Sequence, residues 1–195
     1  MADIVLATFD AKWIHASFGL RCLRANLGEL RDRSALFEFD LETRALDAAE
    51  AILAVSPRIV GLGVYVWNAT LSLQLARLLK QLRPELVLVV GGPEVSYETE
   101  AQELARLADH VVRGEADLAF AELCRARLHS EVELPHLIDA PPPRIEQLAW
   151  PYDEYDARDL AHRVVYVEAS RGCPFTCEFC LSALEIPVRA APLEG

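Results

Sequence analysis

Three cysteines near the end of the chain have a spacing that suits an inorganic cofactor. Cys173, Cys177 and Cys180, called the cysteine triad below, form the pattern CxxxCxxC. Thiolates in such short runs hold iron–sulfur clusters. No fourth cysteine follows, so the triad would leave one iron of a four-iron cluster open to a substrate or cofactor. The spacing therefore predicts a 4Fe-4S cluster that is used for chemistry rather than for structure alone.

Structural zinc and plain buried cysteines are the alternatives for this motif. A zinc site usually needs a fourth Cys or His at short spacing, and the chain offers neither after Cys180, while His162 lies upstream. Residues 163–168 (RVVYVE) have the composition of a strand that leads into the triad. The remaining cysteines, Cys22 and Cys124, lie in helical patterns and are expected to be buried and inert.

Composition and charge restrict the class of protein. The chain has 195 residues, 52% of them apolar, which suits one domain plus part of another. A net charge of −11 argues against a nucleic-acid partner, which needs a basic surface. No apolar run approaches the ~20 residues that span a bilayer, and Met1 leads into an apolar strand without the basic start of a signal peptide. Five cysteines, three of them clustered, fit a reducing compartment, so we expect a cytoplasmic protein without a membrane partner.

Apolar segments alternate with helical patterns through residues 1–132. The predicted strands cover residues 3–9, 35–41, 59–66, 86–90 and 109–112. The predicted helices cover residues 20–30, 48–55, 71–82 and 98–107, and a last one reaches residue 128. This alternation predicts βαβ units in a parallel sheet with helices on both faces. The expected α/β fold is flavodoxin-like (Rossmann-like), with a five-stranded parallel sheet in the order 2-1-3-4-5.

Proline divides the rest of the chain. Residues 133–162 contain a run of three prolines, Pro141 to Pro143, and are predicted to be a linker on the surface. Residues 163–195 are then expected to begin a second domain, with one strand followed by the cysteine loop. The domains are therefore expected at 1–132 and 163–195.

The carboxyl ends of the strands are the expected ligand side of such a sheet. Gly91 and Gly92 would let the backbone approach a ligand closely, and Tyr65 and Trp67 offer flat apolar faces. Each feature also has an explanation that needs no ligand. The glycines could form a tight turn, Trp67 could close the end of the core, and His15, in the loop after the first predicted strand, could be an ordinary surface residue. No GxGxxG follows the first strand, which argues against a dinucleotide site.

The order of these features resembles that of cobalamin-binding radical SAM (S-adenosylmethionine) proteins. The segments LATFDAKWIHASFGLRCL, GVYVWNA, GGPEVSYE, VVRGEAD and SRGCPFTCEFCLSALE resemble one uncharacterised bacterial subgroup over essentially the whole chain. The resemblance implies that the triad holds the cluster, that SAM chelates its open iron, and that Phe179 lies beside the adenine. It also implies a cobalamin whose corrin lies over the strand ends. The implied cobalamin contacts are His15, Tyr65, Trp67, Asn68, Gly91, Gly92, Pro93, Glu94, Gly114 and Glu115.

The resemblance implies a radical reaction. SAM would be cleaved to a 5′-deoxyadenosyl radical with an electron from a donor such as flavodoxin or ferredoxin, and methylcobalamin could deliver a methyl group. The DxHxxG motif of other cobalamin domains is absent, because Asp10 and His15 are five apart and Gly19 is four beyond. His15 as an axial ligand of cobalt therefore stays an open alternative.

Because only residues 181–195 follow the triad, a radical SAM barrel would be truncated, and this chain alone is expected to be inactive. The competing hypothesis is a non-catalytic cobalamin-binding or interaction module with a vestigial cysteine loop. A receiver-like module would need an acidic cluster after the third strand, where the chain has Val66, Trp67 and Asn68.

Overall fold

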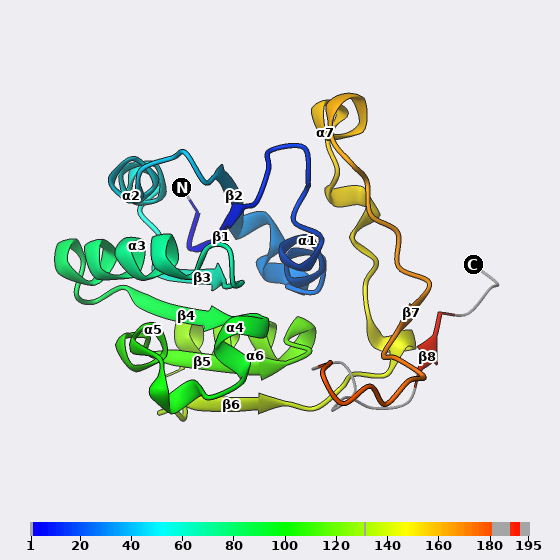
Figure 1. The fold of residues 1–195 in the computed structure, drawn as a ribbon. Helices are drawn as coiled ribbons and strands as arrows, with labels where there is room; N and C mark the ends of the chain where they lie inside the picture. Colours follow the sequence, from blue (N-terminus) through cyan, green and yellow to red (C-terminus); the bar gives the residue numbers. More distant parts are fainter. Residues whose placement is uncertain (1, 131, 181–187, 192–195) are drawn as a thin grey trace.

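A six-stranded parallel sheet forms the centre of the molecule (Figure 1). The computed structural model describes residues 2–130, 132–180 and 188–191. The strand order is β2-β1-β3-β4-β5-β6, so the predicted order of the first five strands is confirmed. The strands are β1 (Ile4–Asp10), β2 (Ser34–Asp40), β3 (Ile59–Gly63), β4 (Val87–Gly91), β5 (His110–Gly114) and β6 (Leu137–Ala140).

Helices cover both faces of the sheet, because the central strands carry apolar side chains on both sides. The main helices are α1 (Phe18–Ala25), α2 (Ala45–Ala54), α3 (Ala69–Leu82), α5 (Glu103–Leu107) and α6 (Asp117–His129). One apolar core joins α2, α3 and α5 to residues such as Val60 and Leu88. The other joins α1 and α6 to Leu6, Val89 and Val112. None of the helices in the described ranges is long and apolar enough to cross a bilayer.

Two predicted helices are shorter than expected. The helix predicted over residues 20–30 ends at Ala25, and the 3-10 helix η1 (Gly28–Arg33) follows, because Gly28 has a φ of 59° that an α-helix cannot continue. The helix predicted over residues 98–107 is divided at Gln102, whose backbone is extended. The 3-10 helix η2 (Thr99–Ala101) precedes that break, and the short helix α4 (Pro93–Ser96) precedes η2.

The prediction of five strands is wrong, because part of the predicted linker adds a sixth. β6 pairs with β5 in parallel, with Val111 opposite Leu137 and Gly114 opposite Ala140. Leu137 and Ile138 point to opposite faces and pack against the two apolar cores. The proline run starts only after the strand ends. Beyond it lie η3 (Ile145–Gln147), η4 (Pro151–Glu154) and α7 (Ala157–His162).

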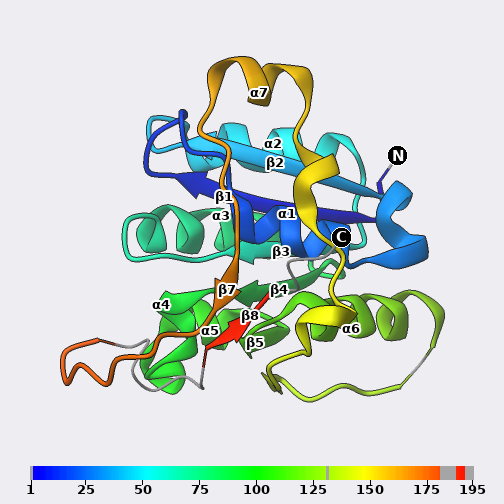
Figure 2. The same cartoon turned by 90° about the vertical axis from the view of Figure 1, so that its right-hand side faces the viewer.

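Residues 163–172, called the C-terminal segment below, do not form the predicted barrel strand. Val164 makes an isolated parallel bridge with His15, and β7 (Ser170–Arg171) pairs antiparallel with β8 (Arg189–Ala190). A strand needs a neighbour for its backbone hydrogen bonds, and the described residues supply no barrel strand beside residues 165–168. Instead, the C-terminal segment, in orange, runs down across the edge of the sheet in front of the strands (Figure 2).

Candidate functional site

The loops selected from the sequence meet at one edge of the sheet. Because all six strands run parallel, their carboxyl ends lie together, and those of β3 to β6 face the viewer in Figure 2. His15 lies in the loop after β1, Tyr65 and Trp67 follow β3, Gly92 follows β4, and Glu115 follows β5. The C-terminal segment lies across the same edge. The structure therefore brings the selected loops together at one edge, and their contact with a ligand stays a prediction.

Three glycines leave a trough on the face of the sheet that α1 and α6 cover. Gly61 and Gly63 are two residues apart in β3, so they face the same side. Gly91 of β4 pairs in register with Gly63, and Val89, two residues earlier, belongs to the core on that side. These three positions, called the glycine trough below, therefore lack side chains on adjacent strands.

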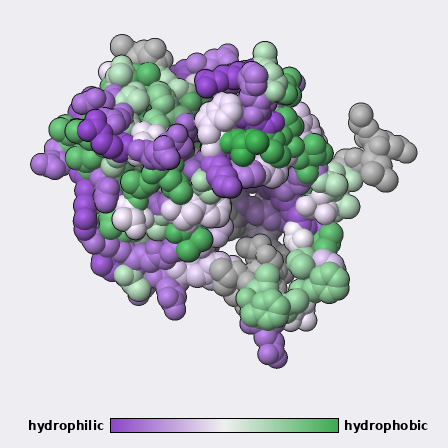
Figure 3. Space-filling view, turned by 45° about the horizontal axis from the view of Figure 1, so that its top comes forward, coloured by the Kyte–Doolittle hydropathy of each residue, from purple (hydrophilic) through white to green (hydrophobic). Residues whose placement is uncertain are grey.

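The glycine trough is the floor of a cavity of about 540 Å³. Its deep walls are apolar and come from α1, α6 and the neighbouring strands; they are Leu20, Cys22, Leu23, Val89, Val112 and Phe120. The polar side chains stand at or beyond the carboxyl ends of the strands and so surround the mouth; they are Tyr65, Glu115, Asp117, Glu168, Ser170 and Arg171. An apolar cavity of this size with a few polar groups is typical of a site for an organic ligand. The surface is hollowed between the main body and the lobe at the lower right of Figure 3.

Two further glycines shape the mouth of this cavity through their backbone. Gly92 has a φ of 111°, and a Cβ there would collide with the carbonyl oxygen of Val64. Gly114 has a φ of 83°, and a Cβ there would lie 2.8 Å from the carbonyl oxygen of Ala140. Both conformations favour glycine strongly. The turns after β4 and β5 can therefore pass close to the adjacent strands and leave the cavity open above them.

Asn68 holds the loop after β3 in place. Its side chain is fully buried, and its Oδ1 accepts a 2.8 Å hydrogen bond from the backbone N–H of Tyr65. Its Nδ2 donates to the carbonyl oxygens of Phe9 (3.0 Å) and Gly63 (3.2 Å) and to the hydroxyl of Thr8 (3.1 Å). The structure thus gives Asn68 a positioning role, and its predicted contact with a cofactor stays a prediction.

Tyr65 and Trp67 form a stacked pair on this loop. Their rings are 4.6 Å apart between centroids and within 4° of parallel. Trp67 Nε1 donates a 3.2 Å hydrogen bond to the carbonyl oxygen of Phe9, while 48% of the residue is exposed. Burial, and next the nearby Asp10, raise the pKa of Tyr65. The pair therefore offers a fixed aromatic surface at the edge of the sheet.

A smaller cavity of about 320 Å³ lies beside this pair and is called the aromatic cavity below. It is lined by Asp10, His15, Tyr65, Trp67 and Tyr166, among others. His15 Nδ1 lies 2.6 Å from the hydroxyl oxygen of Tyr166, which belongs to the C-terminal segment. Burial, and next the negative charge of Glu38, raise the pKa of Asp10 to about 7. The cavity therefore combines aromatic faces with a carboxyl whose charge changes near neutral pH.

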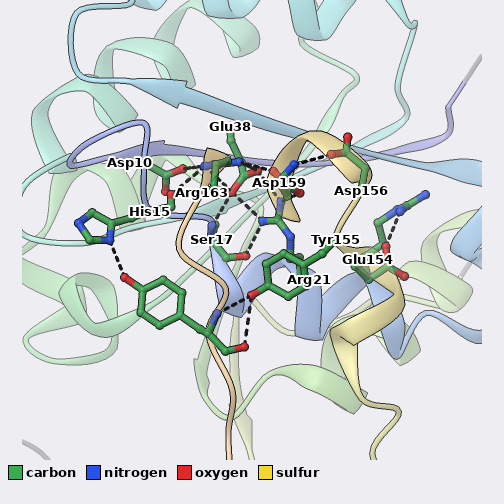
Figure 4. A network of polar contacts seen from close by, with 12 residues as sticks. Asp10, His15, Ser17, Arg21, Glu38, Glu154, Tyr155, Asp156, Asp159 and Arg163 are labelled. Carbon is green, nitrogen blue, oxygen red and sulfur yellow. Dashed lines mark hydrogen bonds and ion pairs between the residues drawn. The ribbon is translucent and has the colours of Figure 1, made fainter. Parts of the chain in front are cut away.

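A buried ion-pair network ties the C-terminal half of the chain to the sheet (Figure 4). Arg21, only 1% exposed, donates to Glu38 (2.7 Å) and to Asp159 (2.6 Å). Arg163 donates to the same two carboxylates, at 2.6 and 3.2 Å, and lies 3.2 Å from Asp10. Burial opposes the ionisation of Glu38, but the hydrogen bonds from Arg21 and Arg163 outweigh it and lower the pKa of this carboxyl. The network fixes residues 159–163 beside β1 and β2.

Arg171 holds the C-terminal segment at the mouth of the glycine-floored cavity. Its guanidinium donates two hydrogen bonds to Asp117, at 2.7 and 3.1 Å, and one to Glu115 at 3.0 Å. Its Nε donates to Glu168 at 2.9 Å. Arg189 also pairs with Glu115. The loop after β5 and the C-terminal segment are thus joined by charge at the entrance.

The structure does not gather the cysteine triad around one point. Cys177 and Cys180 are exposed and Cys173 is half-buried. Across residues 2–130, 132–180 and 188–191, no three Cys, His, Asp or Glu side chains form a group that could hold a metal ion. Phe179 is 94% exposed, and residues 181–187, which follow the triad, lie outside the described residues. The cluster and the role of Phe179 therefore stay predictions, whereas Cys22 and Cys124 are buried as predicted.

Most residues selected from the sequence line one of the two cavities. Those in the glycine-floored cavity are Tyr65, Gly91, Gly92, Pro93, Gly114 and Glu115. Those in the aromatic cavity are His15, Tyr65 and Trp67. Glu94 is half-buried beside Pro93 and belongs to the lining of neither. Sequence reasoning missed Gly61 and Gly63, although G-x-G inside a predicted strand places two glycines on one face.

Comparison with known proteins fits this geometry. A family model described as the B12 binding domain matches residues 4–124, which contain β1 to β5 and the glycine trough. This chain belongs to the B12-binding domain family. The matched residues also include the loops after β1, β3, β4 and β5 that were selected from the sequence. β6, the C-terminal segment and the cysteine triad lie outside the matched residues.

Among curated proteins, the B12-binding chain is similar to three methyltransferases. It is 31% identical over 175 residues to 2-(S-pantetheinyl)-carbapenam-3-carboxylate methyltransferase of Streptantibioticus cattleyicolor, covering 75% of this chain and 25% of the relative. It is 28% identical over 151 residues to the cobalamin-dependent radical SAM methyltransferase TokK of Streptomyces tokunonensis, covering 65% and 22%. An uncharacterised methyltransferase of Pyrococcus horikoshii is 30% identical over 165 residues, covering 73% and 35%. The chain thus spans only about a quarter to a third of the length of these relatives.

Among solved structures, the chain is similar to a cobalamin-binding protein from Desulfitobacterium hafniense DCB-2. The two are 23% identical with a TM-score of 0.49, and the match covers 65% of this chain and 58% of the other.

Proposed function

We propose that this chain binds cobalamin at the carboxyl edge of the sheet, with the nucleotide tail in the glycine-floored cavity and the corrin over the loops after β1, β3 and β4. The observation that carries the proposal is the glycine trough, which lies within the residues that match the family and forms the floor of a cavity of about 540 Å³. The tail of cobalamin is narrow and ends in an apolar base, and the corrin is broad and flat. A deep apolar cavity beside a stacked aromatic pair fits both parts.

The chain's own residues would position this ligand. The apolar walls at Leu20, Val112 and Phe120 would exclude water from the tail. Asn68 keeps Tyr65 and Trp67 stacked at the edge, where they can support the corrin. We propose that His15 does not bind cobalt, since the DxHxxG motif is absent. When bound, cobalamin supplies a transferable methyl group, which is the cofactor's own chemistry.

The finer proposal is that the chain serves a cobalamin-dependent radical SAM methyltransferase. Its support is the CxxxCxxC spacing of the cysteine triad and the similarity to TokK, whose name states this activity. SAM and an electron donor such as flavodoxin or ferredoxin would then be partners. As placed in the structure, the triad does not form a ligand set for a 4Fe-4S cluster, so no step of the reaction is derived through the cluster.

A cobalamin carrier without cluster chemistry is the second candidate. The exposed and separate cysteines of the triad favour it. Anaerobic reconstitution of the chain with iron and sulfide separates the two candidates. Binding of about four iron atoms per chain, lost in a variant with the triad changed to alanine, supports the radical SAM proposal. Iron binding that is unchanged in that variant contradicts it.

Anaerobic titration with hydroxocobalamin tests the cobalamin proposal itself. A corrin spectrum that stays with the protein through gel filtration, without the shift caused by histidine ligation, is expected. A His15→Ala variant serves as the control and should give the same spectrum. A folded protein that emerges without corrin would overturn the proposal.

A further inference from the structure

We propose that the glycine-floored cavity selects among cobamides by their nucleotide base, and prefers a benzimidazole to a purine. Cobamides are corrinoids with a nucleotide tail, and natural cobamides differ in the base of that tail. The inference rests on the proposed function, because it assumes that the tail enters this cavity. It adds the class of cobamide that the chain takes.

The deep part of the cavity offers a base little to hydrogen-bond with. Among the described residues that line it, the side chains deeper than the strand ends are aliphatic, aromatic or the thiol of Cys22. Gly61, Val89 and Val112 lie within the sheet, where the backbone of β3, β4 and β5 already pairs with strands on both sides. Burial, and next the negative charge of Asp117, raise the pKa of Cys22 to about 12, so this group stays a neutral thiol, and Arg171 hydrogen-bonds to it from the mouth. The deep part therefore suits apolar groups.

The charged side chains of the cavity stand at its mouth and are paired with one another. Glu115, Asp117 and Glu168 accept hydrogen bonds from Arg171, and Glu115 also pairs with Arg189. Tyr65 follows the end of β3, on the same edge. A base that enters beyond this ring of charges therefore leaves the charged groups behind.

The two kinds of base differ in what they would leave unpaired. Dimethylbenzimidazole carries two methyl groups and has one free ring nitrogen when its tail is extended. Adenine carries an amino group and further ring nitrogens, and each would lose water without gaining a partner. A buried polar group without a partner weakens binding about tenfold or more. A Cβ at Gly63 would lie 3.3 Å from Leu20, and a Cβ at Gly91 would lie 3.2 Å from the Val112 carbonyl oxygen, so a larger side chain at either position would narrow the cavity.

The test measures the dissociation constants of three probes with the purified chain under anaerobic conditions: cobalamin, the cobamide with adenine as its base, and cobinamide, which has no nucleotide. Equilibrium dialysis with detection of the corrin absorbance gives all three. We expect cobalamin to bind about tenfold tighter, or more, than the adenine cobamide. Cobinamide should bind more weakly than cobalamin, because it leaves the cavity empty.

Variants that fill the glycine trough test the location of the effect. Gly91→Val should weaken cobalamin binding about tenfold or more while leaving cobinamide nearly unchanged, and Gly63→Ala should act in the same direction with less risk to folding. Val60→Ile, on the opposite face of β3, is the matched control and should change none of the constants. Circular dichroism checks that each variant is folded.

The outcomes separate the two proposals. Equal affinity for cobalamin and the adenine cobamide, or a preference that survives both trough-filling variants, overturns the inference and leaves the cobalamin proposal standing. Failure of the folded chain to bind any of the three probes overturns both.

Discussion

The substitution Asn68→Asp tests whether a buried amide holds the loop after β3. Asn68 Nδ2 donates to three oxygen atoms, at 3.0–3.2 Å, on Thr8, Phe9 and Gly63. Aspartate has nearly the same shape but would set an oxygen against these three oxygens. Each buried group left without a partner costs about 1–3 kcal/mol, and an unpaired buried charge adds to this. We expect the free energy of unfolding to fall by about 3–5 kcal/mol at about pH 8.

The pH dependence of this penalty has a definite sign. Burial without a positive partner raises the pKa of the introduced carboxyl above its unfolded value of about 3.9. The folded state then binds a proton that the unfolded state has lost, so the free energy of unfolding falls as the pH rises through that interval. The penalty should therefore be smaller at about pH 5 than at about pH 8. Asn68→Ala, which introduces no charge, should show a penalty without this pH dependence.

Urea unfolding followed by far-ultraviolet circular dichroism measures both variants at the two pH values. A loss below about 1 kcal/mol for Asn68→Asp at the higher pH would refute the reasoning. So would the same pH dependence in both variants. The first result would mean that the loop keeps its conformation without the Asn68 amide, and the second that the introduced carboxyl is not the source of the pH dependence.

Three further predictions concern the turn after β4, the network and the buried thiols. Gly92→Ala should lower the free energy of unfolding by about 2–4 kcal/mol, because Gly92 has a φ of 111° and the new Cβ would collide with Val64. Urea unfolding measures this loss, and a change below about 0.5 kcal/mol would contradict the prediction. Burial raises the pKa of Asp10 to about 7, so the folded protein holds a proton on Asp10 more tightly than the unfolded chain does. The stability that this proton contributes is fully present below the unfolded pKa of about 3.9 and is lost as the pH rises towards 7. Asp10→Asn should flatten the pH dependence of thermal unfolding over that interval, and an unchanged profile would refute the assignment. Iodoacetamide at about pH 8 should label the cysteine triad and spare Cys22 and Cys124, because burial raises the pKa values of these two thiols to about 12. Mass spectrometry of the native protein measures the labelling. Labelling of either buried thiol at the rate of the triad would contradict their burial.

The sheet could be predicted from the sequence where local pattern decides the structure. β1, β3 and β4 are short apolar runs between turn residues, and their alternation with helical patterns fixes a parallel order. β6 escaped prediction because it has only four residues, lies between prolines, and forms through pairing with β5. The short strand is stabilised by a partner that the local sequence does not reveal.

The site could be predicted in position and only partly in its contacts. Topology places ligands at the carboxyl ends of parallel strands, which selected Tyr65, Trp67 and Gly92, and the structure places all three in cavity linings. The Arg21–Asp159 pair could not be predicted this way, because the two residues lie 138 positions apart in the sequence. Arginine and aspartate are also common on protein surfaces, so neither residue stands out. Such pairs depend on the path of the chain after β6, which local sequence does not fix.

A crystal structure of the chain with cobalamin tests the central claim most directly. Anomalous scattering from cobalt locates the corrin independently of the surrounding density. We predict the cobalt over the carboxyl ends of β1 and β3, without a bond to His15, and the nucleotide base inside the glycine-floored cavity. A cobalamin bound with its base outside that cavity, or with the corrin on another edge of the sheet, would contradict it.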